Sequence, residues 1–398
     1  MIYLDNAATT FPKPDCVYDK VNIVQRTIAV NVGRGSYRAA FEAMRIVDET
    51  RQLLASLVGA AGPDAVVFTP SATIAANEII LGLEWDSFKN VYVTPFEHNA
   101  IARPLFCKCK EFGIEIQMIP FDSDTHMLDE DELERLFAIN PPDYVFVNHV
   151  SNVTGTIVPI EKIAALSKAY DALVVVDGSQ SVGLLPIELK NSNIDYLVFA
   201  GHKNLYASWG IGGFVTNSSF PLKPVLSGGT GSDSLNLEMS PNLPAGFEFA
   251  SPNIIAIASL HESLRWLKDV SIKEIAMHKD QLMHKLIAGL TACGVHLYLP
   301  SNVSSHTSVL SFNVPGYEAG EIGVILNEDF DIAVRTGYHC APFIHNFLNT
   351  IETKGTVRVS LETMEETRKE SKESHSTGYT RMAGMGSKQL PESLLAHG

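Results

Sequence analysis

The sequence predicts an α/β protein in which helices cover both faces of a mostly parallel β-sheet. Short β-rich runs alternate with longer segments whose apolar residues lie three or four positions apart, the spacing of an amphipathic helix. Several of the short runs are apolar throughout, as in residues 173–176, which is typical of a strand buried on both faces. In such sheets ligands bind at the carboxyl ends of the strands, so polar residues there are candidates for a functional site.

The predicted elements fall into two regions. The strands of the first region are residues 65–69, 90–94, 115–119, 144–148, 173–177 and 196–200, and the helices between them include 74–83, 129–138 and 160–170. The second region begins near Asn253, with predicted helices at 254–270 and 272–292 and strands at 308–313, 332–335 and 356–360. We therefore expect a large domain over 16–252 and a smaller α+β domain built from 1–15 and 253–361.

Composition narrows the class of protein. The chain has 398 residues, 45 % hydrophobic and 19 % charged, which is enough apolar sequence for a large core. A net charge of −15 argues against nucleic acid or an anionic membrane as a partner. The sequence has no long apolar run and no signal-peptide pattern, so we expect a cytoplasmic protein. Its five irregularly spaced cysteines favour reduced thiols and predict no metal site.

Two polar residues at strand ends suggest pyridoxal 5'-phosphate (PLP) as a cofactor. Lys203 follows the strand at 196–200, and Asp177 ends the preceding strand. A lysine can bind the aldehyde of PLP covalently, and an aspartate can keep the pyridine nitrogen protonated. Taken singly, Lys203 is more simply explained as a surface lysine and Asp177 as a helix cap. The hypothesis of a PLP site therefore depends on Lys203 and Asp177 occurring together.

Three further segments at strand ends fit the same cofactor. The small residues of 69–73 open a helix whose N–H groups and hydroxyls can hold a phosphate, although Ser71 or Thr73 there can equally be an ordinary N-cap. His98 can lie flat on the cofactor ring or be an ordinary loop histidine. Asn152 can donate a hydrogen bond to the cofactor or to a substrate carboxylate, or simply form a turn.

Together these segments resemble the class V aminotransferases, most of all the cysteine desulfurase and selenocysteine lyase group. The resemblance covers about nine-tenths of the chain, and its motifs are residues 4–10, 34–35, 69–77, 97–99, 151–155, 177–180, 201–203, 228–231, 335–342 and Arg358. It implies the PLP-dependent transferase fold of type I, with a seven-stranded sheet, and a homodimer. The substrate implied is L-cysteine or a related amino acid, and a protein that accepts its sulfur is an expected partner.

The resemblance also implies a role for each matching residue. Lys203 is expected to carry the cofactor, with Asp177 at the pyridine nitrogen, Gln180 at the phenolic oxygen and His98 stacked on the ring. The phosphate is expected to be held by four residues, the last of them acting from the partner subunit: Ala72, Thr73, His202 and Thr230. Asn152, Arg335 and Arg358 are expected to bind the substrate.

Cys340 completes the predicted chemistry, because residues 335–342 resemble the short-loop form of the family's catalytic cysteine segment. Its thiolate would attack the substrate sulfur and leave a persulfide, and Arg335 or His339 can supply positive charge nearby. Two alternatives are a plain buried cysteine and a metal site formed by His339, Cys340 and His345. Selenocysteine lyase, sulfinate desulfinase, another PLP reaction and a non-catalytic relative remain open as functions.

Two departures from the family pattern lead to further expectations. Residues 206–210 replace a turn that contains Gly-Pro in relatives, so Ala207 would be strained if that turn requires a positive φ. Residues 362–398 are polar and lack the amphipathic helix that closes the small domain of relatives, so we expect a disordered or atypical tail.

Overall fold

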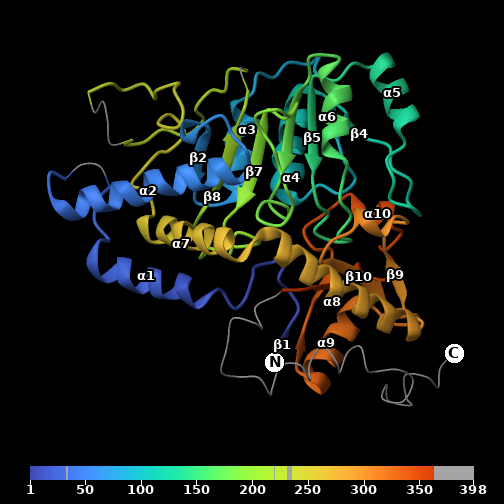
Figure 1. Ribbon diagram of the computed structural model, residues 1–398. Coiled ribbons are helices and arrows are strands. Elements are labelled where there is room, and N and C mark those ends of the chain that lie inside the picture. Colours follow the sequence, from blue (N-terminus) through green and yellow to red (C-terminus); the bar gives the residue numbers. More distant parts are fainter. Residues whose placement is uncertain (33–34, 219, 231–234, 363–398) are drawn as a thin grey trace.

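A seven-stranded sheet forms the centre of the molecule (Figure 1). The computed structural model describes residues 1–32, 35–218, 220–230 and 235–362. The strand order is β2-β8-β7-β6-β5-β3-β4, and β8 is antiparallel to both neighbours whereas the other pairs are parallel. The bounds are β2 Val66–Thr69, β3 Val91–Val93, β4 Ile116–Met118, β5 Tyr144–Asn148, β6 Leu173–Asp177, β7 Tyr196–Ala200 and β8 Gly212–Thr216. This sheet confirms the predicted fold class.

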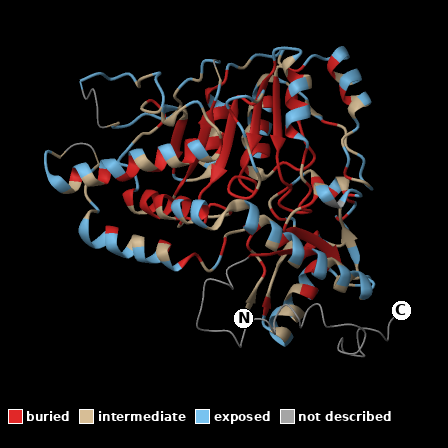
Figure 2. Ribbon diagram, in the orientation of Figure 1, coloured by how far each residue is buried: buried red, intermediate tan, exposed pale blue. Residues whose placement is uncertain are grey.

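Helices cover both faces of this sheet because successive strand residues point to opposite sides. In β6, Val174 and Val176 pack into a core with α1 (Asp15–Thr27), α2 (Arg38–Leu57), α5 (Glu130–Ile139), α6 (Ile160–Lys168) and α7 (Ile254–Val270). Leu173 and Val175 pack on the other side, with α3 (Ala72–Gly82) and α4 (Asn99–Phe112). Figure 2 shows most strands of this sheet buried, whereas β4 at its edge is half-buried to exposed. The all-apolar strand runs therefore reflect burial on two faces.

A four-stranded antiparallel sheet forms the second region, in the order β12-β13-β10-β9. Its strands are β9 His296–Tyr298, β10 Val309–Asn313, β12 Arg335–Gly337 and β13 Thr356–Ser360. The helices are α8 (Ile272–Ala292), α9 (Ala319–Phe330) and the short α10 (Ile344–Phe347). A separate parallel pair joins β1 (Ile2–Tyr3) to β11 (Ile332–Ala333), and a bridge between Asp5 and Ser360 brings the two ends of the described chain into one region.

The structure corrects one predicted strand, whereas the predicted domain bounds and tail are not tested by it. The strand predicted at 332–335 is wrong as a single element, since β11 and β12 belong to different sheets. The domain bounds 16–252, 1–15 and 253–361 stay a prediction. The expected tail lies outside the described residues except for Glu362. No described helix combines the length and apolar character needed to cross a membrane.

Candidate active site

Parallel strands bring Asp177 and Lys203 to one edge of the large sheet. Asp177 ends β6, is buried, and accepts a hydrogen bond from the Ser179 N–H at 2.9 Å. Lys203 follows β7 in the turn that leaves the sheet, and its backbone carbonyl accepts a hydrogen bond from the Thr10 hydroxyl at 2.9 Å. Because β6 and β7 are parallel neighbours, both residues lie at the carboxyl end, where ligands bind.

The surroundings of Lys203 favour an amine that can lose its proton. Burial is the main cause that lowers the pKa of Lys203 to about 8, and Asp177 opposes the shift. The charges of Arg335 and Arg358 lower this pKa further, whereas that of Cys340 raises it. Residues far apart in the sequence therefore act electrostatically on one amine. A neutral amine is the form that can attack an aldehyde.

His98 begins α4 and is neutral at pH 7. Its Nδ1 accepts a hydrogen bond from the Ala100 N–H at 3.0 Å, which leaves the proton of the neutral ring on Nε2. Burial, followed by the positive charge of Lys203, lowers the pKa of His98 to about 4. His98 is therefore the N-cap residue of α4 rather than a plain loop histidine, and its stacking on the cofactor ring stays a prediction.

The phosphate cradle is predicted at the N-terminus of α3. Ser71 caps this helix by accepting from the Ile74 N–H at 3.3 Å, so the N-cap interpretation is confirmed for Ser71, and Ala72 and Thr73 start the first turn. The N–H groups of a first turn have no partner within the helix. A Cβ placed on Gly212 would lie 2.5 Å from the Ala72 nitrogen, so this glycine keeps the approach to that amide open.

His202 stands beside Lys203, with its ring stacked on the exposed Trp209 at 3.9 Å between centroids. Its Nδ1 is buried without a hydrogen-bond partner, and burial lowers the pKa of the ring to about 3. Such a nitrogen is free to bind an added group. The turn that follows does need a positive φ, but at Tyr206 (58°) and not at Ala207, so the expected strain at Ala207 is wrong.

Asn152 and Arg358, which are both expected to bind the substrate, contact each other. Arg358 donates from Nη1 to the Asn152 carbonyl at 2.9 Å and from Nη2 to the Asp5 carboxylate, and its Nε has no partner. Asn152 donates from Nδ2 to the His339 carbonyl at 2.8 Å, and its Oδ1 is buried without a partner. These unsatisfied polar atoms mark a place where a carboxylate or amine can bind.

Cys340 lies in a strained loop that docks on the same site. Both His339 (φ 47°) and Cys340 (φ 57°) adopt the left-handed conformation, which places the half-buried thiol next to a cation. Arg335 donates from Nη2 to the Cys340 sulfur at 3.2 Å, and the Cys340 carbonyl accepts from the Asn99 N–H at 2.7 Å. The Asn99 contact holds the loop against the segment that carries His98.

The remaining predicted residues have clear positions. Gln180 is buried and donates from Nε2 to the Ala7 carbonyl at 2.8 Å. Thr230 is half-buried in the segment 220–230, and its expected contact with a partner subunit stays a prediction. Among the described residues no cluster of three His, Cys, Asp or Glu side chains could hold a metal, and the set of His339, Cys340 and His345 is not such a cluster.

Sequence reasoning missed two buried residues next to the site. Glu97 is fully buried, its Oε1 accepts from the Thr94 hydroxyl and the Asn148 N–H at 2.6 Å each, and burial raises its pKa to about 8. Lys13 is buried and donates to the His202 carbonyl at 2.6 Å, and burial lowers its pKa to about 8. Glu97 had a signal, its position beside His98, whereas nothing around Lys13 indicates its contact.

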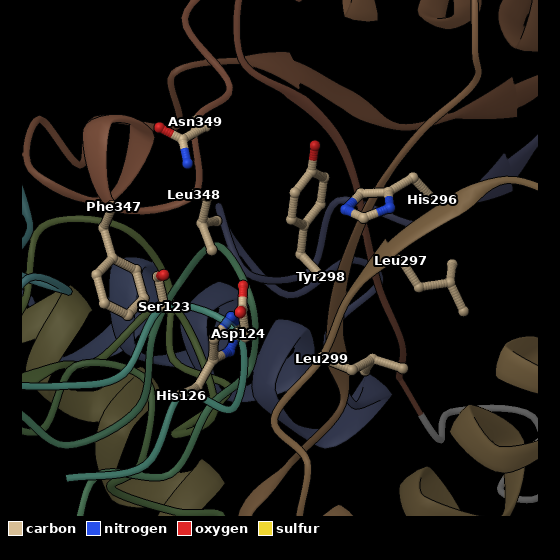
Figure 3. Close-up of a pocket in the computed structure, with 10 residues that line it drawn as sticks. All are labelled: Ser123, Asp124, His126, His296, Leu297, Tyr298, Leu299, Phe347, Leu348 and Asn349. Atoms are coloured by element: carbon tan, nitrogen blue, oxygen red, sulfur yellow. The ribbon is translucent and has the colours of Figure 1, made fainter. Parts of the chain in front are cut away.

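A cavity of about 160 Å³ lies outside this site. Figure 3 shows side chains of the 123–126 turn, of β9 and Leu299 after it, and of the end of α10 with the two residues that follow around this space. Aromatic and polar side chains dominate its lining, including His126, His296, Tyr298, Phe347 and Asn349. None of the predicted site residues lines it, so it is separate from the strand-end site.

Residues of the strand-end site fit PLP in chemical type. The chain offers a lysine whose pKa is lowered, a carboxylate for the pyridine nitrogen, a neutral imidazole, and an open helix N-terminus kept accessible by Gly212. Bound PLP supplies an electron sink that makes the Cα proton of an amino acid acidic. The unpartnered Nδ1 of His202 and Oδ1 of Asn152 are further polar atoms available to such a group.

Comparison with known proteins agrees with this geometry. A family model described as aminotransferase class V matches residues 2–370. A probable cysteine desulfurase of Pyrococcus abyssi is 31 % identical over 369 residues, which cover 90 % of this chain and 89 % of that protein. A cysteine desulfurase of Yersinia pestis is 30 % identical over 353 residues, which cover 86 % of this chain and 84 % of that one.

Solved structures give the same picture. The apo structure of a cysteine desulfurase from Thermococcus onnurineus superposes with a TM-score of 0.86 at 29 % identity, covering 97 % of this chain and 94 % of that one. A cysteine desulfurase from Escherichia coli superposes with a TM-score of 0.80 at 22 % identity, covering 96 % and 92 % of the two chains. The second likeness shows the fold.

Proposed function

Because the chain belongs to the class V aminotransferase family, we propose that it is a PLP-dependent cysteine desulfurase. It takes L-cysteine to L-alanine and leaves the sulfur as a persulfide on Cys340. The observation that carries this proposal is the convergence of Lys203, Arg335 and Cys340 on one site, through the Arg335–Cys340 hydrogen bond and the electrostatic coupling of all three. The relatives and structures named cysteine desulfurase support it.

The residues divide the work by their chemistry. Arg358 donates from its unpartnered Nε to the substrate carboxylate, and the unpartnered Oδ1 of Asn152 accepts a hydrogen bond from the substrate amine. Lys203 removes the Cα proton, since its lowered pKa makes the free amine accessible near neutral pH. His98 is held neutral with its proton on Nε2 and can donate to, or stack on, the bound cofactor.

Cys340 performs the sulfur transfer. Its thiolate forms a bond to the substrate sulfur as the substrate Cβ–S bond breaks, and a proton added at Cβ completes alanine. The sum is cysteine plus thiolate giving alanine plus the persulfide anion, so no external oxidant is needed. Arg335 donates a charge-assisted hydrogen bond to this sulfur at 3.2 Å and so holds it in the site. A thiol-containing acceptor protein would then remove the persulfide sulfur.

A homodimer is part of the proposal. Thr230 is expected to reach the phosphate of the partner's site. Exposed apolar side chains also support an interface. Leu235 and Leu237, which are close to Thr230 in the sequence, are almost fully exposed. Tyr37 and Phe41 lie on the surface at the start of α2. Mixing inactive Lys203→Ala and Thr230→Val subunits should restore activity, because the mixed dimer then contains one intact site. Failure of such mixtures would count against the shared site.

The function is tested by assaying purified, PLP-loaded protein with cysteine. Equimolar alanine and reductant-released sulfide, both lost in Lys203→Ala and in Cys340→Ser, are the expected result. Selenocysteine and cysteine sulfinate are assayed in parallel, and a clear preference for either would reassign the substrate. An absorbance band of lysine-bound PLP without any sulfide would keep the cofactor site and overturn the desulfurase activity. All five cysteines are free thiols, which supports action in a reducing cytoplasm.

A further inference from the structure

A buried ion pair lies behind the turn that carries Lys203. Lys279 of α8 and Glu362, just after β13, are joined at 3.0 Å between Nζ and Oε2, and both side chains are less than a tenth exposed. The two residues come from the second region of the chain, whereas the turn belongs to the large sheet. In Figure 1, α8 runs from the end of α7 toward β9. Buried charges are retained only with good partners, so this pair requires an explanation.

The pair contacts two residues of the turn that follow Lys203. Lys279 donates to the Asn204 side-chain oxygen at 2.9 Å, and the Tyr206 hydroxyl donates to Glu362 Oε1 at 2.6 Å. The Lys279 ammonium also lies 5.7 Å from the centre of the Tyr206 ring. Asn204 in turn donates to the Gln180 carbonyl at 2.7 Å. The hydrogen bonds of one ion pair thus reach the residue next to Lys203 and the residue in the strained conformation.

The geometry points to Lys279 and Glu362 as a positioning pair that fixes the turn bearing Lys203. The statement about the cofactor rests on the proposed function, whereas the statement about the turn concerns the chain alone. Tyr206 holds a left-handed φ of 58°, which a tyrosine adopts only when its surroundings enforce it. Its hydroxyl is anchored on Glu362, and Glu362 is held in place by Lys279.

The turn that the pair contacts is closed by only a few backbone hydrogen bonds. The Tyr206 N–H donates to the Lys203 carbonyl and the Ala207 N–H donates to the Gly201 carbonyl, each at 2.8 Å. Loss of either member of the pair leaves an uncompensated charge beside these bonds, so the turn would open more often. Neither Lys279 nor Glu362 is one of the predicted site residues. Their effect on Lys203 is therefore one of position.

Hydrogen exchange tests the inference without relying on activity. We expect the amides of residues 201–207 to exchange about tenfold faster or more in Lys279→Met than in the wild type, because hydrogen bonds to a charged group are lost. Tyr206→Phe, which removes a single hydroxyl, should give a smaller rise in the same segment. Release of PLP from the loaded protein to a scavenging apoenzyme should accelerate in the same order.

Lys168→Met is the matched control. Lys168 also pairs with a carboxylate, that of Asp195, at 2.6 Å. Asp195 lies just before β7, whereas Lys203 follows that strand. Exchange of 201–207 should stay at the wild-type rate in this variant. Equal acceleration in the control would overturn the inference, as would unchanged exchange in Lys279→Met and Tyr206→Phe. Should Lys279→Met fail to fold, Tyr206→Phe and Glu362→Gln decide. If the wild type takes up no PLP, the proposed function fails while the exchange result still decides the role of the pair.

Discussion

Replacing Lys203 with methionine should stabilise the cofactor-free protein. A protonated lysine in this site is poorly solvated and faces two arginines, Arg335 and Arg358, which is why its pKa falls from the ordinary 10.5 to about 8. Asp177 and Cys340 offset only part of this effect. Methionine has a similar length and no charge to bury. Lys203, which is expected to carry the cofactor, thus destabilises the folded protein.

The size of the gain follows from the pKa of Lys203. The gap between 10.5 and about 8 corresponds to about 3 kcal/mol, at about 1.4 kcal/mol for each pH unit. Between these two values the unfolded chain holds more protons than the folded one, so the stability of the wild type rises with pH. Lys203→Met should therefore gain about 3 kcal/mol near pH 7 and only about 1 kcal/mol at about pH 9.5.

Urea unfolding of both proteins, stripped of cofactor, at the two pH values measures this difference. Lys223→Met is the control, because its side chain is 69 % exposed and a surface change of this kind should stay within about 0.5 kcal/mol. A Lys203→Met variant that is no more stable than the wild type near pH 7 would refute the reasoning. So would a gain that grows as the pH rises.

Three more outcomes are expected. Arg335→Gln removes the hydrogen bond to the Cys340 sulfur, so alkylation of that thiol by iodoacetamide near pH 7 should slow by about tenfold, and an unchanged rate would contradict the contact. Gly212→Ala places a Cβ 2.5 Å from the first amide of α3, so the Kd for PLP measured by fluorescence should rise by about tenfold, whereas Gly320→Ala, with open space around it, leaves the Kd unchanged. Arg358→Leu breaks a buried ion pair and should lower the free energy of unfolding, measured by urea denaturation, by about 3–5 kcal/mol. A loss below about 1 kcal/mol would contradict this expectation.

Most of the large sheet could be predicted because its strands are apolar on both faces. The strands at 144–148, 173–177 and 196–200 match β5, β6 and β7 residue for residue. The helices at 254–270 and 272–292 match α7 and α8 in the same way. Strand β8 was not predicted from its residues, since its two leading glycines weaken any strand signal. They are there because Phe199 and the start of α3 leave no room for a Cβ.

Candidate site residues at strand ends could be predicted, whereas residues that act from elsewhere could not. Asp177 and Lys203 lie where parallel strands end, and those strand ends can be recognised in the sequence. The contacts of Asp5 and Lys13 depend on the chain closing over a long distance, and neither residue lies in a periodic element that would place it. Positive φ at Tyr206 is likewise set by tertiary contacts and not by its residue type.

The meeting of the two chain ends has a consequence for synthesis on the ribosome. Arg358 and its carboxylate partner Asp5 are 353 residues apart, and β1 must wait for β11 before it can pair. At about 5–20 residues per second, roughly 20–70 s separate the appearance of the two partners. During this interval the large sheet can form, but the arginine expected to bind substrate does not yet exist. A nascent chain therefore cannot begin to release reactive sulfur before Arg358 has been synthesised.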